Sequence, residues 1–120
     1  MSKKIYLDAF YDQYEDFLHQ MMAVFPGDPE WPRYRTAVVV FRKANPTTLV
    51  LKTWECVAPY EAAITQRDES FFLQQEIPEG PMTHTLVKLK SLWQQLDVHN
   101  RSVVWDYVRN ITYLAKRCAA

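Results

Sequence analysis

The sequence predicts an all-α protein, a compact single-domain bundle or orthogonal array of about five helices. Apolar side chains recur every third or fourth residue through most of the chain, which is the spacing of one face of an α-helix. Only two glycines occur, whereas turn-rich β folds use this residue freely where φ is positive. With 48% hydrophobic residues in 120, the chain can bury one core, so we expect residues 1–120 to form one domain.

The first predicted helix covers about residues 4–25 and is amphipathic. Its apolar residues share one side and most of its acidic residues lie on the other. Pro26-Gly27 ends it, because proline cannot continue the hydrogen-bond ladder. Residues 26–32 contain three prolines and are predicted as a shaped loop from which Trp31 folds back on the body of the protein.

The second predicted helix covers residues 32–44 and starts at a proline, which suits the first helical position. The β-branched run 37–41 within it is also compatible with a strand. We favour the helix because the run is short, is flanked by basic residues and has no evident partner strand. A helix places four apolar residues on one side: Tyr34, Ala37, Val38 and Phe41.

Asn45-Pro46 predicts the start of the third helix, with the asparagine as N-cap and the proline in the first turn. This helix is expected to reach about residue 66, and Pro59 either kinks it or restarts it. Asp68 can cap a short helical turn over residues 69–73.

Residues 74–81 contain two prolines and a glycine and are predicted as a loop. The fourth helix follows, capped by Thr83 or Thr85, and Asp97 closes it and caps the fifth helix, which covers about residues 98–118. The apolar faces of these helices are expected to meet in one core. The predicted core residues are Phe10, Phe17, Met21, Phe41, Trp54, Leu89, Trp93, Val104, Val108 and Ile111.

Charge is unevenly distributed although the formal net charge is zero. Residues 1–31 hold two lysines and six acids, a net charge of −4, and residues 80–120 hold six basic residues and two acids, a net charge of +4. We interpret this as two ends that lie beside each other with cancelling fields. The alternative is two separate faces for two partners.

The remaining sequence features predict an intracellular protein with reduced thiols and no membrane association. Cys56 and Cys118 do not make a disulfide framework and are interpreted as small buried hydrophobes. No apolar stretch approaches the ~18 residues that a membrane span needs. No signal-peptide pattern follows Lys3 and Lys4.

The sequence predicts no catalytic residue, no cofactor and no metal site. His19, His84 and His99 are scattered, and no cysteine stands near one at ligand spacing. Two glycines are too few for a phosphate-binding loop, a dinucleotide fingerprint or a nucleophile elbow. A small hydrolase whose site the sequence does not locate is the second alternative function.

Protein–protein interaction is the favoured function, as an adaptor, scaffold or accessory module that binds another protein or a second copy of itself. Four tryptophans, seven tyrosines and six phenylalanines exceed what a small core hides, and Trp, Tyr and Arg are enriched at binding hot spots. Aromatics expected to be partly exposed are Tyr6, Tyr11, Trp31, Tyr60 and Tyr113. The candidate partner-binding residues are Tyr11, Trp31, Arg33, Arg35, Tyr60, Arg109 and Tyr113.

Nucleic-acid binding is the first alternative, because basic residues of the second and last helices are interleaved with aromatics that can stack on bases. The zero net charge counts against it, since phosphate affinity grows with the number of cations engaged. This alternative gains if the basic residues merge into one positive surface. Those residues are Arg33, Arg35, Arg42, Arg109, Lys116 and Arg117.

A series of helix caps, helix breaks and aromatic residues runs along nearly the whole chain: Val24-Phe25-Pro26, Asn45-Pro46, Val57-Ala58-Pro59-Tyr60, Arg67-Asp68-Glu69-Ser70-Phe71-Phe72, Leu92-Trp93 and Val104-Trp105-Asp106-Tyr107. In this series the chain resembles small uncharacterised helical proteins of large DNA viruses that infect algae and protists. The shared features are structural, so the resemblance carries over no reaction. It implies a viral protein that acts in the host cytoplasm or within the virion.

Overall fold

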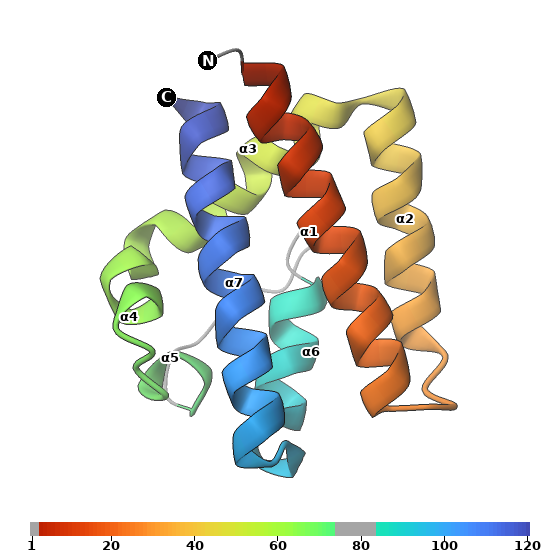
Figure 1. Ribbon diagram of the computed structural model, residues 1–120, viewed down its shortest axis with the longest axis vertical. Coiled ribbons are helices and arrows are strands. Elements are labelled where there is room, and N and C mark those ends of the chain that lie inside the picture. Colours follow the sequence, from red (N-terminus) through yellow and green to blue (C-terminus); the bar gives the residue numbers. More distant parts are fainter. Residues whose placement is uncertain (1–2, 74–83) are drawn as a thin grey trace.

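The computed structural model describes residues 3–73 and 84–120, which are almost entirely helical and contain no strand (Figure 1). Two long helices, α1 (Lys3–Val24) and α7 (Val98–Ala119), lie side by side and antiparallel. Helix α2 (Glu30–Ala44) packs on the other side of α1, and α3 (Pro46–Val57) packs against α7 and α2. The predicted all-α fold is therefore confirmed, and the run of residues 37–41 is helical.

The remaining elements are short. The 3-10 segment η1 (Ala58–Tyr60) leads into α4 (Glu61–Thr65), and α5 (Ser70–Leu73) follows. Helix α6 (His84–Leu92) continues as the 3-10 segment η2 (Trp93–Gln95). The described residues thus form more elements than the five helices predicted, because the third predicted helix is divided.

The division occurs at Pro59, which restarts the chain and does not kink a continuous helix. Helix α3 ends at Val57, and the proline lies in the following 3-10 turn, where its missing N–H leaves no helical hydrogen bond unmade. At the other end of α3, Asn45 occupies the N-cap position, but its side chain makes no capping hydrogen bond to the described residues.

Two aspartates cap helices as predicted. Asp97 accepts a hydrogen bond from the backbone N–H of Asn100 at 2.8 Å at the start of α7, and Asp68 accepts one from Ser70 at 3.0 Å at the start of α5. Thr85 is the second residue of α6 and is buried, so it does not cap that helix. The predicted loop 74–81 and the alternative cap Thr83 lie outside the described residues.

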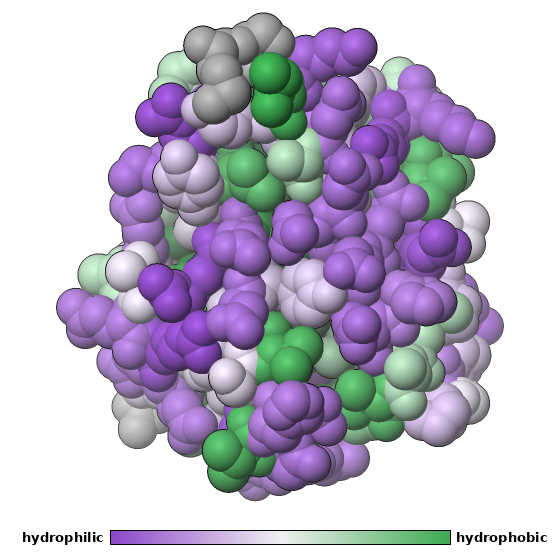
Figure 2. Space-filling model, in the orientation of Figure 1, coloured by the Kyte–Doolittle hydropathy of each residue, from purple (hydrophilic) through white to green (hydrophobic). Residues whose placement is uncertain are grey.

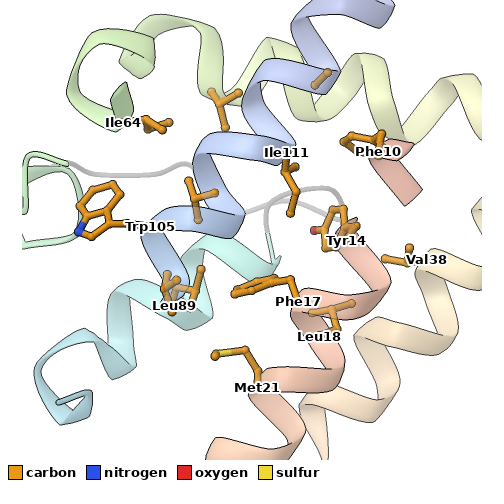
Figure 3. Close-up of a cluster of buried hydrophobic side chains, with 14 of the residues drawn as sticks. Phe10, Tyr14, Phe17, Leu18, Met21, Val38, Ile64, Leu89, Trp105 and Ile111 are labelled. Atoms are coloured by element: carbon orange, nitrogen blue, oxygen red, sulfur yellow. The ribbon is translucent and has the colours of Figure 1, made fainter. Parts of the chain in front are cut away.

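The core lies between α1, α7 and the helices behind them (Figure 3). Eight of the ten predicted core side chains are buried. The other two, Phe41 and Trp54, are half-buried and pack on the edge of the core, and Ala37 is exposed. Helix α2 buries only a narrow stripe against α1, so part of its apolar run faces outward. Buried aromatics that the prediction omitted are Tyr11, Tyr14, Trp31, Phe71, Phe72 and Trp105.

Replacing Trp31 by alanine is expected to lower the free energy of unfolding by about 3–5 kcal/mol, the usual cost of removing a large buried aromatic side chain. Urea denaturation followed by circular dichroism measures this change. Arg33→Ala, two residues further along α2 at an exposed position, serves as the control and is expected to stay within about 0.5 kcal/mol of wild type. Equal stability of the two variants would contradict the assignment of Trp31 to the core.

Candidate functional site

Two of the seven candidate partner-binding residues, Tyr11 and Trp31, are fully buried, so the prediction was wrong for them. The Tyr11 hydroxyl donates a hydrogen bond to the carbonyl of Pro46 and joins α1 to the start of α3. Trp31 packs among Phe17, Phe25 and Tyr34, with ring centroids 5.8–6.4 Å away. Both rings fill the space beside α1, which leaves neither free for a partner.

The other five candidates divide between different parts of the surface. Arg33 and Arg35 are exposed on α2, and Arg109 and Tyr113 are exposed on α7. Tyr60 is half-buried, because its ring packs against α5. The pair on α7 lines a groove.

Helix α1 separates the basic residues of α2 from those of α7 (Figure 1). Arg42 turns from α2 onto α1, where its Nη1 lies 2.9 Å from Asp12 Oδ1 and 2.7 Å from Glu15 Oε2. Lys116 of α7 pairs with Glu61 of α4 at 2.9 Å. The single positive surface that would favour a nucleic acid is therefore absent from the described part of the chain.

A groove of about 710 Å³ runs between α4 and α7. It exists because α4 has only five residues and covers a small part of the 22-residue α7. Buried Ile64 and Thr112 lie at its base. The complete lining is Glu61, Ile64, Thr65, Asp106, Arg109, Asn110, Thr112, Tyr113, Lys116 and Arg117.

Ion pairs fix most charged groups at the groove. Glu61 binds Lys116, and Asp106 accepts a hydrogen bond from Arg67. The Arg117 guanidinium lies 5.0 Å from the centre of the Tyr6 ring and donates to its hydroxyl at 3.1 Å. The lining holds three cationic side chains, Arg109, Lys116 and Arg117, against two carboxylates, so the groove carries a net positive charge.

Arg109 and Tyr113 are the two groove residues best placed to meet a partner. They are separated by four residues on α7 and so lie on one side of that helix. Tyr113 is 55% exposed, and Arg109 is exposed with no hydrogen-bond or ion-pair partner among the described residues. This half of the groove therefore presents an aromatic ring beside an uncompensated guanidinium.

A second charged cluster joins the start of α2 to α6. Lys88 Nζ lies 2.8 Å from both Asp28 Oδ2 and Glu30 Oε1, and the hydroxyl of Tyr34 donates to Glu30 at 2.8 Å. Hydrogen bonds from Lys88 lower the pKa of both carboxyls, and burial together with the bond to Glu30 raises the pKa of Tyr34 to about 12. All charges are paired here, so the cluster holds α6 in place.

An apolar cavity of about 40 Å³ lies in the core between α1, α3, α6 and α7. It has room for little more than water. The Tyr14 hydroxyl donates to Thr85 Oγ1 at 2.9 Å beside it, and burial raises the pKa of Tyr14. The volume is far below that of a substrate pocket.

Neither thiol is activated for nucleophilic chemistry. Cys56 and Cys118 are half-buried, whereas the sequence analysis predicted that both are buried in the core. Burial raises the pKa of both thiols. Within residues 3–73 and 84–120, no three His, Cys, Asp or Glu side chains gather as they would around a metal ion. None of the helices described is long and apolar enough to cross a bilayer.

No protein-family model, no curated protein and no solved structure matches this chain.

Replacing Lys88 by methionine is expected to weaken the dependence of stability on acid pH. The lowered pKa values favour the charged carboxyls in the folded state. Their contribution is therefore complete above the ordinary values, 3.8 for Asp28 and 4.5 for Glu30, and is lost as the pH falls through the lower folded-state values. Melting temperatures measured across this acid range test the change.

Lys52→Met removes an exposed lysine paired with Glu55 at 3.2 Å and is the matched control. It should leave the acid profile of the wild type intact. A Lys88→Met profile that runs parallel to both others would argue against the cluster as the source of the pH dependence.

Proposed function

We propose that this chain is a non-catalytic protein–protein interaction module that binds an acidic segment of a protein along the groove between α4 and α7. The observation that carries the proposal is the exposed pair Arg109 and Tyr113, which lines an open, positive groove. Arginine and tyrosine are among the residues that contribute most to binding energy at protein interfaces.

The energetics of the groove support an acidic partner. Lys116 and Arg67 are already compensated by Glu61 and Asp106, so they add little attraction. Arg109 has no such partner within the described chain, so a carboxylate from outside can form a bidentate ion pair without breaking an existing one. The exposed ring of Tyr113 supplies apolar contact next to it at a small entropic cost.

The character of the surface also supports contact through charge. Figure 2 shows that the face bearing α1 and α7 is mostly hydrophilic, with apolar side chains in small separate groups. An obligate partner would cover a larger continuous apolar area. A reversible, salt-sensitive interaction fits this face better.

Replacing Arg109 by alanine is expected to weaken the binding of a fluorescein-labelled peptide rich in Asp and Glu by about tenfold, as loss of a hot-spot arginine does. Tyr113→Ala is expected to weaken it as well. Fluorescence anisotropy at low ionic strength measures both affinities. Arg35→Ala removes the same charge from an exposed site on α2 and should bind like wild type.

Failure of every acidic peptide to bind would refute the proposed function. A mixed oligonucleotide provides the comparison for the alternative. If it binds with strong salt dependence and loses affinity on Arg109→Ala while acidic peptides do not bind, the groove recognises a nucleic acid.

A further inference from the structure

The exposed side of α1 carries a line of carboxylates. Asp8, Asp12 and Asp16 follow one another at intervals of four residues, all three are exposed, and they lie along one side of the helix. The side chain of Asp12 is 68% exposed even though Arg42 contacts it. This line runs beside α7, because α1 and α7 are neighbours on the same face of the protein (Figure 1).

The exposed side of α7 carries a line of the opposite sign. Arg109, Tyr113 and Arg117 are also spaced by four residues and are exposed. The acidic line on α1 and this basic line on α7 together make up what we call the α1–α7 face. It is negative on one half and positive on the other.

Three hydrogen bonds fix the register between the two lines. Tyr107 donates to Asp16 at 2.6 Å, Asn110 to Gln13 at 3.4 Å and Arg117 to Tyr6 at 3.1 Å. Each step forward along α7 matches an equal step back along α1. Arg109 is therefore level with the midpoint between Asp12 and Asp16, and Tyr113 with the midpoint between Asp8 and Asp12.

We propose that the acidic segment recognised by Arg109 and Tyr113 is helix α1 of a second copy, so that the chain forms a two-fold symmetric dimer through its α1–α7 face. This inference rests on the proposed function and names its partner. The two-fold axis runs parallel to α1 and α7 and lies in front of the seam between them. It therefore places α7 of each copy over α1 of the other. Such a contact is isologous and closed.

The register makes this dimer complementary in charge. Rotation about an axis parallel to the helices keeps every residue at its own level. Arg109 of one copy then lies within about two residues, roughly 3 Å along the axis, of Asp12 and Asp16 of the other copy. Tyr113 reaches the gap between Asp8 and Asp12, and symmetry repeats each contact.

One approach of like charges in this arrangement is already compensated within each copy. Asp106 of α7 comes level with Phe17 and so faces Asp16 of the second copy. Arg67 binds Asp106, and the Tyr107 hydroxyl binds Asp16, so neither carboxylate is bare. The zero net charge of the chain adds no overall repulsion between copies.

Sedimentation velocity at low ionic strength tests the dimer. The wild type should sediment as a concentration-dependent dimer that dissociates as salt is added. Arg109→Glu and Asp12→Lys should each raise the dimer dissociation constant by at least about tenfold, because each sets like charges against one another at two symmetric contacts. Arg35→Glu, a charge reversal on exposed α2, should dimerise like wild type.

Mixing the two weakened variants gives the decisive measurement. In a heterodimer of Arg109→Glu and Asp12→Lys, each substituted residue meets an opposite charge, so the equimolar mixture should regain the dimer that neither variant forms alone. Circular dichroism checks that both are folded. Asp8→Lys should weaken the dimer too. Because the wild-type Asp8 side chain has no partner among the described residues, this variant serves as the check in case Asp12→Lys disturbs Arg42.

A wild type that remains monomeric at low salt overturns the dimer, as does a dimer that all three substitutions on the α1–α7 face leave unchanged. A mixture that stays monomeric overturns the proposed pairing of Arg109 with Asp12. If acidic peptides still bind the groove of a monomeric chain, the proposed function stands and the partner is a different protein. If neither peptide nor second copy binds, both proposals fail.

Discussion

The antiparallel packing of α1 against α7 is the constraint on which the rest of the structure depends. Each helix has 22 residues, so the two pack along about 33 Å. Phe17 of α1 and Ile111 of α7 lie close together in the core (Figure 3), where they line the same small cavity, and polar bonds close the seam outside. This pair provides the long surface that the shorter helices need, since a helix of four or five residues has no stability of its own.

The same constraint creates the candidate site. Helices α4 and α5 are held in place by tertiary packing, chiefly by Ile64 and by the aromatic rings of Phe71 and Phe72. Phe72 stacks on Trp93 at 4.3 Å and contacts Trp105 at 5.0 Å. Elements so short cannot cover the outer side of α7, so the groove is a direct consequence of a long helix packed against short ones.

Most of the fold could be predicted from the sequence because it depends on local signals. The spacing of apolar residues and the capping residues Asp68 and Asp97 act within a few positions, and the structure agrees with them. The exposure of single aromatics depends on which faces meet, which periodicity does not specify. Tyr11 and Trp31 were therefore predicted to be exposed, but they are buried. Arg109 and Tyr113, by contrast, share a groove that is formed by the placement of α4 beside α7.

The packing of α1 against α7 also brings together the two oppositely charged ends of the chain. The ends lie beside each other, as the favoured interpretation held, yet their charges are only partly neutralised across the seam. Asp12 and Glu15 of α1 are bound by Arg42 of α2, and Asp16 is bound by the hydroxyl of Tyr107. The α1–α7 seam is bridged by neutral amides and phenols and by one guanidinium stacked on a phenol ring. No ion pair joins the described residues of α1 and α7, although the two helices carry opposite charges. Their common surface is therefore negative on one half and positive on the other. Such a face is complementary to a copy of itself turned by 180 degrees, and no added sequence feature is required for that match.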